Sequence, residues 1–379
     1  MSLLLAATVT LGQLLYTEQI RSVRAHLALL PDINRVEVAI AAGVRVDATP
    51  GTDAEVALDG GDGGATVITG TVARVERRQF ATVVTVADGG AALAAVRPTE
   101  TYHGLPLAQV IRELAGTAGV DTGIVAVLGQ VADWVPDPRR TAAHHVAELA
   151  RLGGGVAHVD RGGRLVAMPW PVGVPDVAMR LDREFLAFAT EALDPGAAEI
   201  PVGAGGAGTA LAPDAWLHAP DPLTTGGGPD ATHRWRPEHA LRTLADVRIA
   251  ADGATRRHDS AGRRLTATCW PQPARRPGDV VQVQEGDDTQ AGPWLLTHVR
   301  HTVAAATATT VLLGIAAGPD TAGGLAGAAA GALGGLLGAS CCPRRSPGSP
   351  ATRRPPPRGP PSRWSPRSTP PSSPGTTTP

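Results

Sequence analysis

The sequence predicts a mainly β protein with an inserted α+β part: two small β-barrel-like domains, a small helix-helix-hairpin domain and a disordered C-terminal tail. Three observations predict this class. Short segments rich in β-branched residues recur at even spacing before residue 100, separated by Gly and Asp clusters. The hydrophobic period then changes to about 3.6 residues, as in a helix. Strand-like segments return near residue 280, and a Pro-rich stretch follows them.

The 379 residues divide into six segments by these patterns. They are a first β-barrel domain (1–100), a helix-helix-hairpin domain (101–170), a loop-rich β segment that is hard to interpret (171–245), closing β-barrel strands (246–318), an Ala/Gly/Leu-rich segment (319–342) and a Pro/Arg/Ser/Thr-rich tail (343–379).

The first domain is expected to contain at least four strands. The segments partly alternate between apolar and polar residues, and turn sequences such as Asp59–Gly64 separate them. The expected strands are 36–40, 54–58, 67–72 and 80–86.

Two helices are expected in the next domain. Apolar residues from Leu107 to Ala118 recur at i, i+3, i+4 and i+7, which places them on one helix face. A second helix is predicted from Thr141 to Leu152, where Gly153–Gly155 ends it. The Pro residues of the intervening Trp134–Arg140 segment favour extended chain.

A hairpin and three late strands complete the expected elements. The hairpin joins 156–159 to 164–168 through Asp160–Gly163, a typical turn sequence. The late strands are 280–284, 294–303 and 309–315, and the first of them follows the tight-turn sequence Pro277-Gly278-Asp279.

Charge excludes one class of partner. All 34 basic residues are Arg, as in a GC-rich coding sequence, and the net charge is −1. Seven of these Arg follow Cys342, so residues 1–342 carry 27 Arg against 35 acidic residues, a formal charge of −8. An acidic body argues against nucleic-acid binding, which needs a dense cationic face.

The cysteines and the N-terminus bear on the compartment. Cys269, Cys341 and Cys342 lack the number and spacing of a disulfide framework or a zinc site. The apolar stretch Met1–Leu15 lacks the basic n-region of a secretory signal peptide and is too short to span a bilayer. We therefore expect the protein in the cytoplasm of the producing cell, not exported by a signal peptide.

Several motifs resemble nucleotide-binding or metal-binding patterns, but a structural interpretation is favoured for each of them. Gly203–Gly208 fits G-x-G-x-x-G, but Pro213 follows and no helical stripe does, so we expect a loop. His144, His145 and Glu148 lack metal-site spacing, and we expect solvated positions on a helix. His298 and His301 lie three apart on a strand and therefore point to opposite faces. No nucleophile motif is present, and we predict no enzyme, cofactor or metal site.

The last two segments leave alternatives open. Residues 321–342 are uncharged and could pass through a membrane, but frequent Gly makes insertion marginal, and a linker or packed helix is the preferred interpretation. Thirteen of the last 37 residues are Pro, which favours disorder. The abrupt change of composition also fits a shifted reading frame.

The order of these elements resembles the baseplate hub family of phage tails and contractile injection systems, often called late control gene D proteins. The similarity is carried by LPLAQVIRELAGTAGVD and DWVPDPRRTAAHHVAELARLGGGVAHVDRGGRLVAM, within residues 103–169. RRPGDVVQVQEGDDTQAGPWLLTHVRHTVAAATATTVLLG is similar to the family's closing strands, and PDINRVEVAI, PGTDAEVALDGG and VITGTVARVE fit its first barrel. The resemblance covers most of residues 20–316, and 170–245 match poorly.

The resemblance implies a structural role and no catalytic, cofactor-binding or metal-binding residues. Family members form a homotrimer in which two similar barrels per chain build a ring of pseudo-sixfold symmetry. That ring joins the hexameric tail tube to the trimeric spike, among other baseplate components. The valine-glycine repeat proteins of type VI secretion fuse hub and spike, whereas here a separate spike protein is expected. The alternatives are a membrane- or surface-associated β protein anchored through residues 321–342 and, third, an enzyme of unrecognised type.

Overall fold

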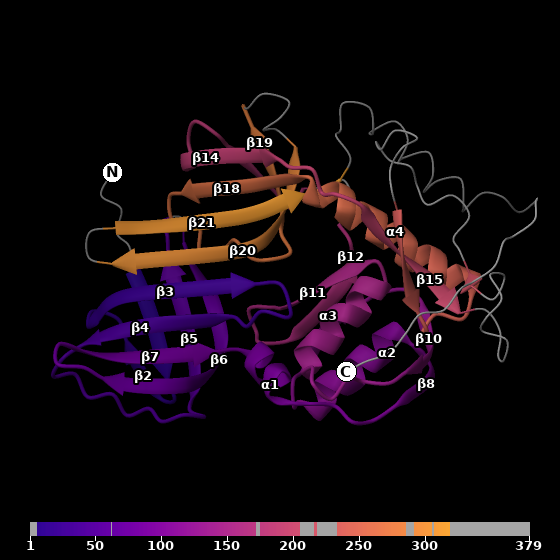
Figure 1. The fold of residues 1–379 in the computed structure, drawn as a ribbon. Coiled ribbons are helices and arrows are strands. Elements are labelled where there is room, and N and C mark those ends of the chain that lie inside the picture. Colours follow the sequence, from indigo (N-terminus) through magenta and orange to yellow (C-terminus); the bar gives the residue numbers. More distant parts are fainter. Residues whose placement is uncertain are drawn as a thin grey trace, which may run out of the picture. The chain divides into compact units, whose positions relative to one another are not determined.

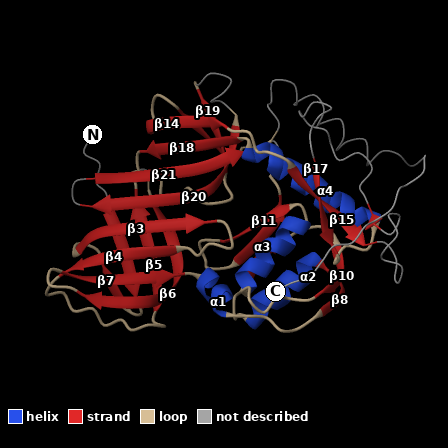
Figure 2. Ribbon diagram, in the orientation of Figure 1, coloured by secondary structure: helices blue, strands red, loops and turns tan. Residues whose placement is uncertain are grey.

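The computed structural model describes residues 6–61, 63–171, 175–204, 216–217, 233–285, 292–304 and 307–318. Over these residues the protein is mainly β with four helices, which confirms the predicted fold class (Figure 2). The predictions for Gly205–Gly208, for the Ala/Gly/Leu-rich segment with Cys341 and Cys342, and for the Pro-rich tail lie outside the described residues.

The N-terminal strands follow the alternation seen in the sequence. In β4 the side chains of Val36, Val38 and Ile40 are fully buried, while the residues between them are exposed or half-buried. Such alternation places one face of the sheet on the core. The strands are β1 (Ala6–Leu11), β2 (Leu14–Tyr16), β3 (Ile20–Ala28), β4 (Arg35–Ala41), β5 (Asp53–Asp59), β6 (Gly64–Arg77) and β7 (Ala81–Ala87).

The helical insertion contains both predicted helices and the hairpin. Val110, Ile111 and Leu114 of α2 are fully buried, and each such side chain contributes about 1.5–3 kcal/mol by leaving water. In the hairpin turn, Oδ1 of Asp160 accepts hydrogen bonds from the Gly162 and Arg164 backbone N–H groups at 2.8 and 3.0 Å. The elements are α1 (Gly89–Ala95), β8 (Tyr102–Pro106), α2 (Leu107–Thr117), β9 (Thr122–Val125), β10 (Gln130–Trp134), α3 (Ala142–Leu152), β11 (Gly155–Val159) and β12 (Leu165–Pro169).

The C-terminal part holds the three predicted late strands and one unpredicted helix. Residues 244–261, where only strands were expected, form the long helix α4, capped by Thr243, whose hydroxyl accepts from the Asp246 backbone N–H. The elements are β13 (Val177–Arg180), β14 (Phe185–Ala192), β15 (Ala198–Ala204), β16 (Trp216–Leu217), β17 (His233–Glu238), α4 (Leu244–Ala261), β18 (Arg263–Cys269), β19 (Val280–Gln284), β20 (Pro293–Ala304) and β21 (Thr307–Ala316).

One sheet runs through both predicted barrel-like parts. Its strand order is β14-β18-β21-β20-β3-β4-β7-β6-β5-β1-β2, with β19 attached at β20 and β13 attached at β19. The connection between the two parts is the antiparallel pairing of β3 with β20, from Ala28 opposite His298 to Ser22 opposite Ala304 (Figure 1). Over the described residues the sheet ends at β2, at β14 and, on its branch, at β13, so it is open and not a closed barrel.

Two large cores and one small apolar cluster around Trp170 result from this arrangement. The large sheet buries Val, Ile and Leu side chains together with Trp294, the largest fully buried side chain among the described residues. A second core joins α2, α3 and α4 with β11, β12 and β15. At that second core Gly253 of α4 faces Gly154, where a Cβ would meet the Gly154 Cα at 2.4 Å. Only Gly fits there, because any side chain would push α4 away from the turn before β11.

Candidate functional site: open strands and a cationic cavity

The polar residues singled out on α3 do not form a common site. The imidazole of His144 is exposed, with its Nδ1 2.9 Å from the Thr141 hydroxyl. His145 was expected to be solvated, and this prediction is wrong: it is 3% exposed and lies edge-on to Trp134, with ring centroids 5.9 Å apart. Burial lowers the pKa of His145, so the ring is held neutral. No cluster of three metal-ligating side chains occurs among the described residues.

The two histidines of β20 occupy different surroundings, as their spacing predicts. His301 is buried, its Nδ1 lies 3.0 Å from the Thr310 hydroxyl, and burial lowers its pKa to about 3. The half-buried His298 has its Nε2 3.4 Å from the Asp32 carboxylate and its ring 6.0 Å from that of His26. Their nitrogens therefore do not converge on one ligand.

The Gly-rich motif has a packing explanation where it is described. Gly203 and Ala204 belong to β15 and do not form a loop. A Cβ on Gly203 would lie 2.5 Å from Val247 and 2.7 Å from the Leu241 carbonyl oxygen, so α4 packs directly on this strand. Among the described residues, no helix is both long and apolar enough to cross a membrane. The segment Thr321–Cys342 lies outside them.

Two ends of the large sheet, β14 and the β1–β2 end, are open strands with apolar side chains. β14 has the sequence FLAFATEA with a single charge, and Leu186 on it is 47% exposed. It pairs with β18 on one side only. At the other end, Leu14 and Leu15 of β2 are 43% and 63% exposed. Ala6–Thr8 of β1 pair with β5 but extend beyond β2. Open strands with so few charges are able to pair with a strand of another chain.

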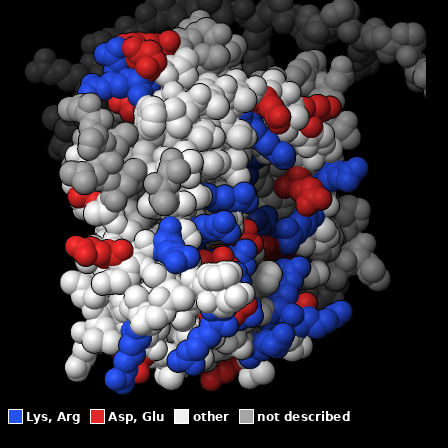
Figure 3. Space-filling model, turned by 90° about the vertical axis from the view of Figure 1, so that its left-hand side faces the viewer, with Lys and Arg blue, Asp and Glu red and all other residues white. Residues whose placement is uncertain are grey.

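Charge on the surface is mixed. Figure 3 shows Arg side chains over the lower part of one face with Asp and Glu side chains between them, and a wide uncharged area above. Several charged side chains of the described residues are paired on the exposed surface, as in Arg78 with Glu76 at 3.0 Å and Arg45 with Asp47 at 2.5 Å. Such exposed pairs contribute little stability.

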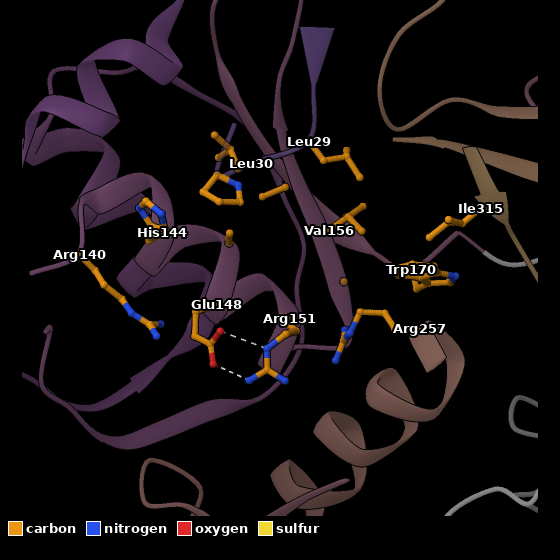
Figure 4. Close-up of a pocket in the computed structure, with 14 residues that line it drawn as sticks. Leu29, Leu30, Arg140, His144, Glu148, Arg151, Val156, Trp170, Arg257 and Ile315 are labelled. Carbon is orange, nitrogen blue, oxygen red and sulfur yellow. Dashed lines mark hydrogen bonds and ion pairs between the residues drawn. The ribbon is translucent and has the colours of Figure 1, made fainter. Parts of the chain in front are cut away.

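A cavity of about 490 Å³ lies between α3, α4, β11 and the chain after β3 (Figure 4). Leu29, Leu30 and Val156 line one side, with Trp170 and Ile315 beside them. The opposite side carries charge. Its charged lining consists of Arg140, Glu148, Arg151 and Arg257.

Glu148 is the only carboxylate in that lining and is already shared by two cations. It pairs with Arg151 at 2.5 Å and with Arg236 at 2.7 Å. Although burial acts to raise it, these two guanidinium groups hold the pKa of Glu148 below its ordinary value. A smaller neighbouring cavity of about 350 Å³ shares Glu148 and is also lined by Glu238, whose pKa burial raises.

Arg257 is the unusual member of the cavity lining. Its Nη1 and Nη2 atoms are cut off from solvent, and neither has a hydrogen-bond partner among the described residues. Burial, followed by the nearby charge of Arg151, lowers its pKa to about 9. The guanidinium therefore remains charged at neutral pH in a place where water cannot solvate it.

A second set of buried polar residues links the loop before β19 to β6 and to the start of α1. The Arg276 guanidinium donates to the Thr66 and Val67 carbonyl oxygens of β6 at 2.7 and 2.8 Å. Nearby, the Asp88 carboxylate accepts from Asn34 Nδ2 at 2.6 Å, and burial raises the pKa of Asp88 to about 6. Arg276 Nη2 and the Asp88 carboxylate are bonded within the chain, while Arg276 Nε has no hydrogen-bond partner among the described residues. The bonded atoms favour a structural role over a binding one.

Sequence reasoning did not find the cavity or the open strands. The residues that form them are distant in sequence and carry no motif. α4, which supplies Arg257, was missed altogether.

Comparison with known proteins identifies the fold through structure alone. No family model and no curated protein matches the chain. It is similar to a tail protein from Neisseria meningitidis, with a TM-score of 0.63 at 15% identity over 84% of this chain and 98% of that one. It is also similar to a 43 kDa prophage tail protein from Shewanella oneidensis, with a TM-score of 0.58 at 13% identity over 82% and 97%.

A third similar structure comes from a secretion system. It is an Escherichia coli component of the type VI secretion system, itself structurally similar to tail proteins of bacteriophage T4. The TM-score is 0.52 at 12% identity, over 81% of this chain and 76% of that one. At these identities the similarity is one of fold.

Proposed function

Because this chain has the fold of phage tail proteins, we propose that it is the baseplate hub of a phage tail or a related contractile injection system. In this role it is a homotrimeric adaptor that binds the hexameric tail tube on one side and a separate trimeric spike protein on the other, among other baseplate components. Its role is structural rather than catalytic. It is made in the cytoplasm of the producing cell and is then built into the particle.

The observation that carries the proposal is the pair of open strands in one sheet. β14 and the β1–β2 end differ in sequence, so a contact between them joins unlike surfaces of neighbouring copies. Contacts of that kind form a closed ring when the rotation between copies divides a full turn. A ring would cover both apolar ends, which would otherwise promote aggregation of a free chain.

The interior supports a structural role in a second way. The buried polar groups on β20 and around Arg276 make hydrogen bonds within the chain through His301 Nδ1 and Arg276 Nη2. The polar residues of α3 also diverge: His144 contacts Thr141, His145 packs on Trp134, and Glu148 pairs with Arg151. Catalysis would require such groups to converge on one point.

The test is the mass of the full-length protein in solution, by light scattering after size exclusion, alone and with the spike protein. We expect three times the mass of the 38.7 kDa chain, either alone or with spike present. A folded monomer that stays monomeric with spike would refute the proposal. Fractionation tests the alternative, because a protein anchored through residues 321–342 would pellet with membranes and resist high salt.

A variant pair tests the open strand directly. Leu186→Lys places a charge on the exposed side of β14, where a lysine discourages pairing with another strand. We expect this variant to remain folded and to lose the trimeric mass. Phe80→Lys is the matched control, because Phe80 is 66% exposed but lies in the turn between β6 and β7. Equal masses for the two variants would exclude β14 from the contact.

A further inference from the structure

We propose that the cavity between α3, α4 and β11 binds a carboxylate group that a segment of a partner protein carries beside an apolar side chain. None of the residues that line this cavity lies on β1, β2 or β14. The inference therefore goes beyond the assembly of copies through the open strands. Its failure and the failure of the trimer would be seen in different measurements.

The cavity lining carries more positive than negative charge. Three guanidinium groups, those of Arg140, Arg151 and Arg257, line the cavity against the single carboxylate of Glu148. That carboxylate is also engaged by Arg236 from outside the lining, at 2.7 Å. The cavity thus keeps an excess of positive charge that its own acidic residue does not neutralise.

The guanidinium of Arg257 is buried without a hydrogen-bond partner for its Nη atoms among the described residues. Burying a charged group without a partner is costly, so proteins rarely keep one unless another charge or a ligand compensates it. Both Nη atoms of Arg257 are buried and lack a hydrogen-bond partner within the described part of the chain. Figure 4 shows Arg257 and Arg151 on the same side of the cavity. Because solvent does not reach these two Nη atoms, a carboxylate in the cavity would offset the positive charge of Arg257 from beside it, together with that of Arg151.

The apolar side of the cavity indicates that the ligand has an apolar part beside its carboxylate. Leu29, Leu30 and Val156 face the cations across the space (Figure 4). A simple inorganic anion would leave this apolar side uncovered. A volume of about 490 Å³ holds an apolar side chain together with a neighbouring carboxylate from a peptide segment.

The carboxylate can belong to an Asp or Glu side chain or to a chain end, and four peptides distinguish these sources. We would titrate the full-length protein by calorimetry with Ac-Leu-Asp-NH2 and its neutral isostere Ac-Leu-Asn-NH2. Ac-Leu-Leu-OH and its amide Ac-Leu-Leu-NH2 would report a chain end. We expect the acidic member of at least one pair to bind roughly 10–100-fold more tightly than its neutral partner, as hydrogen bonds to charged groups allow.

Variants place the binding at the cavity. Arg257→Gln removes the buried charge and is expected to abolish the preference for the acidic peptide. Arg256→Gln is the matched control, because Arg256 is the exposed neighbour on α4 and does not line the cavity. Arg140→Gln is a second test at an exposed position where folding is not at risk, and it should weaken binding by a smaller factor.

Four results would overturn the proposal. They are the absence of binding by every peptide, equal binding of acidic and neutral peptides, unchanged preference in folded Arg257→Gln and Arg140→Gln, and binding of hexanoate as tight as that of the best peptide. The last result would assign the cavity to a small carboxylate and not to a protein segment.

Discussion

Replacing Arg257 by Met should stabilise the folded protein. Burial lowers the pKa of the Arg257 guanidinium from its ordinary value to about 9. At 1.36 kcal/mol per pKa unit, this lowering corresponds to a cost of about 5 kcal/mol. Because the folded-state pKa of this base is the lower one, both states are protonated below pH 9. The whole cost therefore opposes folding at pH 7.

The expected gain is smaller than this cost. Met keeps the length and apolar character of the Arg stem but loses the attraction of Glu148, which acts to raise the pKa of Arg257. Exchanges of buried charged groups for apolar ones typically stabilise by 1–4 kcal/mol. We expect a gain of about 2 kcal/mol in the free energy of unfolding for Arg257→Met.

The assay is urea unfolding of the full-length protein followed by tryptophan fluorescence, at pH 7 and one protein concentration. A gain of about 2 kcal/mol raises the urea midpoint by roughly 0.5–1 M. Arg256→Met, on the exposed side of α4, should leave the midpoint near the wild-type value. A loss of more than about 1 kcal/mol in Arg257→Met would refute the reasoning, because it would mean that the guanidinium is compensated in the folded chain.

Two further predictions concern the buried carboxylate of Asp88 and the turn glycine Gly278. Asp88 has its pKa raised to about 6 in the folded state, so its contribution to stability is full below 3.8 and is lost as the pH rises through 6. Unfolding at pH 4 and pH 7 should show Asp88→Asn gaining about 2 kcal/mol relative to wild type over that interval, because part of the contribution is already lost at pH 4, and a constant difference would contradict the assignment. Gly278→Ala should cost about 2 kcal/mol, because Gly278 has φ +96° and its Cβ would lie 2.9 Å from the His158 ring. Gly43→Ala, with φ +87° and no atom within 4 Å, should cost about 1 kcal/mol in the same thermal unfolding measurement, and equal losses would remove the steric part of the argument.

Local patterns in the sequence predicted local elements well. The stripe from Leu107 to Leu114 appears as the buried face of α2, and Thr141 is the N-cap residue of α3. The Asp160–Gly163 turn joins β11 to β12 as its composition indicates. In each case the residues that determine the structure are neighbours in the chain.

Elements that depend on distant contacts were missed. α4 has a weak apolar stripe and a Gly at its centre, which lowers helix propensity, yet Gly253 is required for close packing on Gly154. α1 begins with Gly89-Gly90, which resembles a turn, but Asp88 accepts a hydrogen bond from the Gly90 backbone N–H and caps it. His145 was assigned to solvent because its packing against Trp134 cannot be predicted from the periodicity of α3.

Separation along the chain also explains why the cavity could not be predicted from the sequence. Arg151 and Arg257 belong to different helices, and the apolar side comes from the end of β3 and from β11. No spacing rule connects such residues. Arg is also the only basic residue in this chain, so none of them stands out by composition.

The pairing of β3 with β20 has a consequence for biosynthesis. Asp32, just after β3, contacts His298 of β20, which lies 266 residues later in the chain. At roughly 5–20 residues per second, a ribosome needs about 13–53 s to make that interval. Throughout that time the nascent N-terminal strands expose the β3 edge that β20 will later occupy. We therefore expect chaperone demand during translation to be concentrated on β3, and ribosomes stalled before codon 293 should present it to added strand-binding chaperones.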